Sequence, residues 1–392
     1  MRFQNSVFVD LLKPIDRRAF GQIVARHKGD AYDKSFKSWD HLVVLIAAQL
    51  GGETSLRSLE AAFNANSGSH YHLGVRRIAR STLAEANARR PVGVFADLFA
   101  RLSCELDRRT RRDGAELLRL IDSTPIPLSK FHDFARSNGR IHGMKMHVVY
   151  DPGVDRPFCV EVTPANVNDV EIRQEDADRG PARPMSSTRA IMIFKWWRDI
   201  HEARALFVTR PKSNTRLTDL ADREMPQTRG EGYTVLRDCE VELASKGDSK
   251  LPMPLRRLHI QRDALKDGKP QLIVVITNDM TRSAVEIAAL YKARWAIELL
   301  FRWIKQHLNI RKFLGENENA VRLQLIAAMI AFVLLRIAAH RHDIELAHLR
   351  FSELAGRFLF ERRPIDRLER PPPKYQAARR RISPRQLELA YA

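Results

Sequence analysis

The first 112 residues show a helical pattern of apolar positions interrupted by turn signals. Residues 39–50 are strongly apolar and are followed by Gly51 and Gly52, which is a typical helix stop. Ser55 then precedes another helical run and is a candidate N-cap. Residues 74–88 are basic and include a further helical stretch. The pattern predicts either a helical bundle with a charged surface or a helix-turn-helix that reads DNA.

A group of short apolar runs follows, and these have the length and composition of strands. They cover residues 117–121, 145–150 and 158–163. Strands that follow each other so closely favour an antiparallel meander. Pro125 is expected to end the first strand, which places Asp122 at a strand edge where a metal ion could reach it. From the residues alone, Asp122 could equally be a turn-initiating Asp before Ser-Thr-Pro.

Residues 215–280 contain a second group of strand patterns separated by turn signals such as Asp267-Gly268. The expected strands cover residues 233–236, 239–243, 255–261 and 271–277. The β-branched content of residues 272–277 predicts a buried central strand. Three basic side chains in this part could line a DNA groove or lie on a solvated surface, namely Arg256, Arg257 and Arg262.

Residues 291–305 predict one continuous helix, because they contain no Pro or Gly and are rich in helix formers. At about 100° of rotation per residue, Tyr291, Arg294, Glu298 and Lys305 fall on one narrow stripe. The opposite face is apolar and suited to packing on a core. On geometry alone, Arg294 and Glu298 could be an ordinary i, i+4 ion pair on a solvated face.

The charge of the chain points to a polyanionic partner. The 392 residues carry a formal net charge of +19, and the sequence pI is about 10.2. Nucleic acid is the first candidate for that partner, and an anionic membrane surface is the alternative, without an amphipathic anchor to support it. The longest apolar run, residues 325–335, is too short to span a bilayer and predicts a buried helix. Three scattered cysteines and the lack of a signal-peptide pattern favour the bacterial cytoplasm, in association with the nucleoid.

Residues 291–305 carry the spacing Tyr-x2-Arg-x3-Glu-x6-Lys, which resembles the signature of the insertion-sequence-four-like transposases. The resemblance also covers residues 165–169, 196–201 and 207–214, and weaker matches lie in the N-terminal helices. This family consists of DDE enzymes. The resemblance implies an α/β fold with a ribonuclease-H-like catalytic core, a β-rich insertion and an all-helical N-terminal domain.

On this basis the expected domains are a helical DNA-binding domain, a catalytic domain and a basic tail. They cover residues 1–112, 113–340 with the insertion at about 215–280, and 341–392.

The family resemblance also assigns roles to individual residues. Asp122 and Glu298 would be catalytic carboxylates that bind metal, with two Mg²⁺ ions expected and Mn²⁺ able to substitute. The residues that would bind DNA are Tyr291, Arg294, Lys305, Arg210 and Lys212. The partners would be double-stranded DNA, as transposon terminal repeats and target, and a second copy of the chain in synapsis, with no membrane. A displaced base could stack on Trp295 or Trp303, although a core position is the more common fate of such residues.

A second catalytic Asp, which the family places before a helix and a Phe-Val-Thr-Arg strand, is missing from residues 173–193. That segment is rich in charge, Arg, Pro and Ser and has no strand pattern before Ala190. One choice of codons for residues 184–193, read two bases out of frame, gives Asp-Val-Phe-Asp-Lys-Gly-Tyr-Tyr-Asp, which contains the missing motif. The codon of the second Asp in this peptide, which belongs to the motif, straddles Ser187 and Thr188. The alternative is a divergent segment, with the carboxylate supplied by Asp176, Asp178 or Asp199.

These observations lead to one principal hypothesis and two alternatives. The chain is expected to be a DNA transposase that performs metal-dependent cleavage and strand transfer at insertion-sequence ends, impaired here by loss of the second Asp. The first alternative is a catalytically inactive protein that binds transposon ends. The second is a structural protein of the nucleoid built on a nuclease-like fold.

Overall fold

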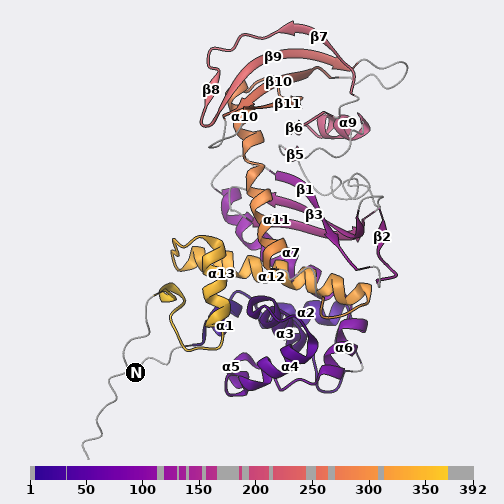
Figure 1. Ribbon diagram of the computed structural model, residues 1–392, viewed down its shortest axis with the longest axis vertical. Helices are drawn as coiled ribbons and strands as arrows, with labels where there is room; N and C mark the ends of the chain where they lie inside the picture. The colour runs from indigo at the N-terminus through magenta and orange to yellow at the C-terminus, as the bar shows by residue number, and fades with distance from the viewer. Residues whose placement is uncertain are drawn as a thin grey trace, which may run out of the picture.

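The computed structural model places helices at one end of the molecule and a large curved sheet at the other (Figure 1). It describes residues 5–31, 33–112, 119–129, 132–137, 141–151, 156–165, 185–187, 194–211, 215–243, 253–263, 270–307 and 313–369.

The N-terminal part is helical, as its sequence pattern predicts. Its helices are α1 (Val7–Leu12), α2 (Arg17–Arg26), α3 (Ser38–Gly51), α4 (Leu56–Ala65), α5 (His70–Leu73), α6 (Arg80–Arg89) and α7 (Gly93–Arg112), with a 3₁₀ turn at Ser67–Ser69. The predicted caps are present. Ser55 accepts a hydrogen bond from the backbone of Ser58 at the start of α4, and Gly52 ends α3 in the left-handed conformation with φ of 71°.

Helices from the other end of the chain complete this helical part. They are α12 (Glu318–Arg341) and α13 (His348–Arg357), followed by a 3₁₀ turn at Ile365–Arg367. Buried residues of α3, α7, α12 and α13 belong to one apolar core. The backbone amides of Val7 and Phe8 donate to Glu361 and Leu359 at 3.0 and 2.8 Å. Residues 341–369, predicted as the start of a basic tail, are therefore packed structure, while residues 370–392 lie outside the described part.

Helix α12 is the predicted buried helix. By length and composition it is the one helix in the described residues that could cross a membrane. However, 83% of its most apolar window is buried inside the protein, as expected for a core helix.

The middle of the molecule is a sheet of mixed direction. Its strands are β1 (Arg119–Pro127), β2 (Arg136–Ser137), β3 (His142–Asp151), β4 (Arg156–Pro164), β5 (Met185–Ser187) and β6 (Phe207–Thr209). β1, β3 and β4 pair antiparallel in sequence, which confirms the predicted meander. β5 then lies between β1 and β6 and is parallel to both. Apart from the short strand β2, which also pairs with β3, the spatial order of the strands is β4-β3-β1-β5-β6.

The predicted β-rich segment extends the same sheet. It contains β7 (Leu217–Asp222), β8 (Arg229–Gly230), β9 (Tyr233–Leu243), β10 (Leu255–Arg262) and β11 (Gln271–Thr277). β11 pairs with β6 through only two residue pairs, Ile276 with Thr209 and Thr277 with Val208. Helix α9 (Phe194–Glu202) packs on one face of this sheet through Trp197, and α10 (Ala284–Lys292) packs on the opposite face.

Several strand predictions need correction. Residues 233–243 form one strand instead of two. β11 is internal in the strand order, but its first half is open to solvent, with Leu272 55% exposed. Pro125 does not end β1, which continues to Pro127. Within the described residues, β5 pairs with β1 as far as Ile121. At Pro125 the described strand partner of β1 is β3 alone, and a strand position with one partner can accommodate a residue that has no N–H.

The predicted single helix over residues 291–305 is broken. Helix α10 ends at Lys292, and α11 (Trp295–His307) begins after a turn at Ala293 and Arg294. The amides of Arg294, Ala296 and Ile297 bond to carbonyls three residues earlier, which is the tighter 3₁₀ spacing. Figure 1 shows the two helices following one another down the side of the molecule, from the β7–β11 part towards α12.

Candidate functional site

Asp122 lies inside β1, on the face of the sheet that is covered by helices. Side chains alternate along a strand, so Asp122 shares its face with Leu120 and Ile126, which belong to the helical core. It pairs in register with Val148 of β3. Its carboxylate is only 13% exposed, and one oxygen accepts the backbone amide of Ser123 at 2.8 Å. A strand on either side of Ile121 holds this part of β1 in place.

Glu298 reaches the same place from α11. The apolar face of α11, with Ile297, Leu300 and Ile304, is buried in the helical core. This packing leaves Glu298 half-buried at the side of the helix, with 34% of its side chain exposed.

Arg294 joins the two carboxylates. Its guanidinium lies 3.6 Å from the carboxylate of Asp122, and it also donates to the carboxylate of Glu298. The structure therefore brings together Asp122, Arg294 and Glu298, which the sequence predicted for one site from segments far apart in the chain. The i, i+4 pair expected on geometry alone is also present, and it forms part of this larger group.

Tyr291 is not on a common exposed stripe with these residues, which corrects the single-helix prediction. It is the last buried residue of α10, is 6% exposed, and packs with Tyr233 and Val235 of β9. Its hydroxyl is buried without a hydrogen-bond partner in the described part of the chain. The predicted contact of this hydroxyl with DNA would need it to become exposed.

The other predicted DNA-binding residues have mixed positions. Lys305 is exposed on α11, and Arg210 is half-buried directly after β6. Lys212 lies outside the described residues. Trp303 is 5% exposed and its ring stacks edge-on against Phe332 at 4.9 Å, so it is a core residue as the alternative expected.

The register of β5 places Ser187 beside Ile121, one residue before Asp122 in β1. Ile121 pairs with Ser187 in parallel, and Ser187 pairs in turn with Thr209. The carboxyl ends of β5 and β6 therefore meet the middle of β1 at one level, where ligands commonly bind in open sheets. The sequence pattern missed β5, because three residues within a charged segment give no recognisable period. Asp176, Asp178 and Thr188 lie outside the described residues, as does the side chain of Asp199.

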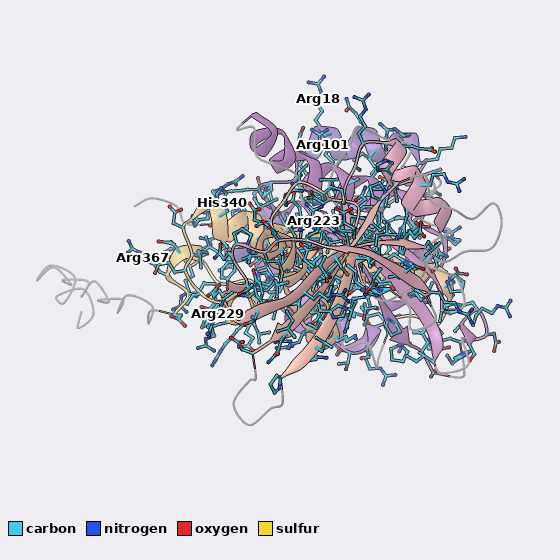
Figure 2. All side chains as sticks on the ribbon, turned by 90° about the horizontal axis from the view of Figure 1, so that it is seen from above. Arg18, Arg101, Arg223, Arg229, His340 and Arg367 are labelled. Atoms are coloured by element: carbon cyan, nitrogen blue, oxygen red, sulfur yellow. The ribbon has the colours of Figure 1, made fainter. Side chains whose placement is uncertain are left out.

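Basic side chains are spread widely around the site and beyond it. Figure 2 shows Arg18, Arg101, Arg229 and Arg367 extending on several sides of the molecule. The excess of positive charge is therefore a property of the whole surface and does not by itself mark one groove.

The side chains at the site fit a divalent cation in part. The carboxylates of Asp122 and Glu298 both pair with Arg294, and carboxylate oxygens are the ligands that Mg²⁺ prefers. In the described part of the chain, however, no set of three His, Cys, Asp or Glu side chains converges as a metal site would need. The described part of β5, Met185–Ser187, contains no carboxylate and pairs with β1 as far as Ile121.

Comparison with known proteins shows which proteins this chain is similar to. Residues 113–334 match the Transposase DDE domain family, and residues 3–76 match a domain of unknown function (DUF4372). A protein of Sinorhizobium fredii that is named as a transposase is 57% identical over 310 residues, which cover 79% of this chain and 85% of that protein.

Two further relatives carry the names of insertion-sequence transposases. The one from Geobacillus stearothermophilus is 30% identical over 75% of this chain and 76% of its own length. The one from Synechocystis is 24% identical over 73% and 77%, respectively. A solved piggyBac transposase complex covers 94% of this chain and 81% of its own, at 13% identity and a TM-score of 0.41.

Proposed function

Because the chain belongs to the DDE transposase family, we propose that it acts on the ends of an insertion sequence by metal-dependent DNA cleavage and strand transfer. The observation that carries the proposal is the convergence of Asp122 and Glu298 on one guanidinium. Double-stranded DNA in the bacterial nucleoid is the expected substrate, and a second copy of the chain is the expected partner in synapsis. The net charge of +19 supports a polyanionic substrate.

We also propose a ribonuclease-H-like core, as the resemblance implied. The strand order β4-β3-β1-β5-β6 supports it, with an antiparallel meander first and two parallel strands after it. The assignment of residues 1–112 to end recognition remains part of the proposal.

In the proposed site, Asp122 and Glu298 would hold the metal. When bound, divalent ions stabilise the negative charge that develops on the attacking and leaving oxygens of an in-line displacement at phosphorus. Arg294, Lys305 and Arg210 are suited to phosphate oxygens and would orient the DNA backbone. Half-burial of both carboxylates against the helical core restricts their motion and keeps the donor atoms in place.

The same segment supports impaired catalysis. Ser187, the last described residue of β5, pairs with Ile121, whose side chain lies on the opposite face of β1 from Asp122. The sequence has no carboxylate at Ser187 or Thr188, the two positions that the second out-of-frame Asp codon straddles, and neither hydroxyl side chain supplies an anionic ligand. The frameshift hypothesis predicts an Asp there, and reading the encoding DNA across residues 173–193 in the alternative frame would test it.

An inactive protein that binds transposon ends is the second candidate, and the lack of a carboxylate at Ser187 and Thr188 is the observation that favours it. Such a protein would compete with active copies for the same ends.

The decisive experiment measures nicking of a duplex that contains the insertion-sequence end, with Mg²⁺ or Mn²⁺. Four proteins are compared: the unsubstituted chain, Glu298→Ala, Thr188→Asp and the double variant with both substitutions. Thr188 is chosen because the second out-of-frame Asp codon straddles Ser187 and Thr188, and Ser187 pairs with Ile121 and not with Asp122. Catalysis by the proposed site predicts that Thr188→Asp raises nicking by about a hundredfold, equivalent to about 2.7 kcal/mol of barrier, and that adding Glu298→Ala removes this gain. Equal nicking by all four proteins, with intact binding of the duplex, would leave only the binding function.

A further inference from the structure

A buried ion pair lies where β9 and β10 meet the start of α10. Arg256 and Asp238 are each 2% exposed, and the guanidinium binds the carboxylate through two bonds of 3.0 and 2.5 Å. Removing two charges from water is costly, and apolar residues of similar volume often stabilise a core as well or better. The sequence predicted Arg256 as a DNA-groove or surface residue, and its burial corrects this. The pair therefore calls for a role other than stability or DNA contact.

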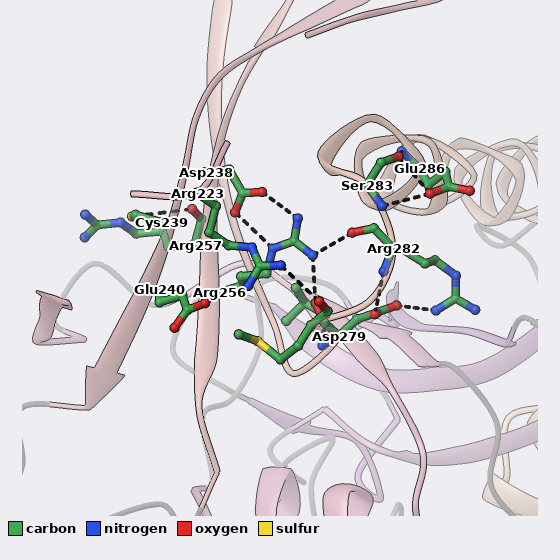
Figure 3. Close-up of polar contacts among 12 residues, drawn as sticks. Arg223, Asp238, Cys239, Glu240, Arg256, Arg257, Asp279, Arg282, Ser283 and Glu286 are labelled. Atoms are coloured by element: carbon green, nitrogen blue, oxygen red, sulfur yellow. Dashed lines mark hydrogen bonds and ion pairs between the residues drawn. The ribbon is translucent and has the colours of Figure 1, made fainter. Parts of the chain in front are cut away.

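The remaining donors of Arg256 hold the loop that precedes α10, which we call the α10 loop (residues 278–283). Nη1 of Arg256 donates to the carbonyls of Asp279 and Arg282 at 2.9 and 2.7 Å. Arg223, which follows β7, donates to the carbonyl of Met280 at 3.0 Å. Figure 3 shows these contacts converging on the loop from the sheet. Two sheet arginines thus fix three carbonyls of one short segment.

Bonds within the α10 loop make it rigid. The Asp279 carboxylate, 1% exposed, accepts the amides of Thr281 and Arg282 at 2.9 and 3.1 Å and also pairs with the Arg282 guanidinium. Ser283 and Glu286 then form a capping box that begins α10. The direction in which α10 leaves the sheet is set by these contacts.

Helix α10 leads directly to the proposed site. It packs on β9 as far as Tyr291, turns at Ala293 and Arg294, and continues as α11 to Glu298. The apolar face of α11 fixes its angle against the core, whereas the α10 loop fixes the point from which the pair of helices starts. The location of Glu298 opposite Asp122 thus depends on both attachments.

We infer that Arg256, held by Asp238, is a positioning residue that sets the location of Glu298 relative to Asp122 through the α10 loop. The inference rests on the proposed function, because it assigns the β insertion a role in assembling the site of Asp122 and Glu298. The part of the insertion with this role is the Arg256–Asp238 ion pair together with the bonds from Arg256 to the carbonyls of the α10 loop.

The test replaces the pair by apolar residues in the full chain, as Arg256→Met with Asp238→Leu. This double variant removes the donors to the α10 loop while filling the same buried space, so the fold should hold and the midpoint of thermal unfolding should not fall. The control is Arg237→Gln with Asp222→Asn, an exposed ion pair between β9 and β7. Among the described residues, the recorded side-chain partners of Arg237 are Asp222 and Asp219, which lie outside the α10 loop. Arg256→Lys keeps the charge and one donor, and is expected to lie between the double variant and the unsubstituted chain.

Two measurements are needed. Amide hydrogen exchange should accelerate at least tenfold in α11 of the double variant, with no change in α12 and none in the control. Binding of Mn²⁺ without DNA should weaken about tenfold in the double variant alone. Unchanged exchange in α11 of the double variant would overturn the inference. If the unsubstituted chain binds no Mn²⁺, the proposed metal site fails, and the exchange measurement still decides the positioning role.

Discussion

Asp122 on β1 and Glu298 on α11 contact the same guanidinium, that of Arg294. One positive charge thus faces two negative ones in a half-buried setting. A divalent cation drawn to these carboxylates has to compete with Arg294, whereas a DNA phosphate would draw Arg294 away from them. Metal binding and DNA binding at this site are therefore expected to support each other.

Substituting Arg294→Gln should tighten Mn²⁺ binding in the absence of DNA by about threefold, since a partly exposed ion pair contributes roughly 0.2–1 kcal/mol. Isothermal titration calorimetry measures the effect. The control is Arg322→Gln, which breaks an i, i+4 pair with Glu318 on α12. Weaker Mn²⁺ binding in Arg294→Gln would mean that Arg294 arranges the carboxylates for the ion.

Tyr291→Phe tests the DNA-binding role that the sequence assigned to Tyr291. Removing a buried hydroxyl without a partner should raise the free energy of unfolding by about 1 kcal/mol and leave DNA affinity unchanged. Tyr233→Phe is the matched control, because its hydroxyl donates to the carbonyl of Val285 at 2.9 Å, and its loss should destabilise by a similar amount. A severalfold loss of DNA affinity in Tyr291→Phe would show that the hydroxyl becomes exposed to bind DNA.

Gly143→Ala should destabilise the strand pair that carries Asp122. A Cβ at Gly143 would lie 2.1 Å from the carbonyl oxygen of Ile126 on β1, so the strands must separate. We expect a loss of about 2 kcal/mol in urea unfolding. Gly21→Ala in α2 is the control, since a Cβ there meets nothing within 4 Å and Ala favours a helix by roughly 0.5–1 kcal/mol. Equal stability of Gly143→Ala and the unsubstituted chain would contradict the tight pairing of β1 with β3.

His41 makes the stability of the helical part depend on pH. It is fully buried, and its Nε2 donates to Oδ1 of Asn87 at 2.7 Å. Its pKa is lowered to about 3 by burial and by the nearby Arg90 cation, whose partner is Asp33. The unfolded state takes up the proton near pH 6.5 and the folded state does not, so stability falls as pH drops from about 6.5 towards 3.

At pH 5 the loss from this one group is about 2 kcal/mol. His41→Gln should therefore flatten the difference in unfolding free energy between pH 7.5 and pH 5. Urea unfolding at the two pH values measures it, and an unchanged difference would locate the pH dependence in other groups.

The helices at both ends of the chain were predictable because their signals are local. Ser55 caps α4 and Gly52 ends α3, and both signals depend on residues next to them in the sequence and not on tertiary contacts. The meeting of Asp122 with Glu298 was also predictable, but through the resemblance of residues 291–305 to a transposase signature. The residue pattern alone left an ordinary ion pair open.

The turn at Ala293 and Arg294 was not predictable, since both residues favour a helix. Its cause is tertiary. Tyr291 packs on the insertion strands, whereas Ile297 and Leu300 pack on the helical core, and these are two separate surfaces. One unbroken helix was predicted from local propensity, whereas the two packing surfaces are met by two helices with a turn between them.

The strand β5 escaped prediction for a related reason. Met185–Ser187 has no alternating pattern, and it is a strand because β1 and β6 bind it from both sides. Ser187 could be placed beside Ile121 only once this pairing was known.

The two residue pairs between β6 and β11 make the insertion an integral part of the sheet. If residues 217–277 were cut out and the ends rejoined, β6 would be left with an open edge, and open edges recruit other chains. A shortened transposase of this kind would need another element to cover this edge and protect it from pairing with other chains. Loss of the whole insertion is thus a far less accessible evolutionary change than changes at its outer strands.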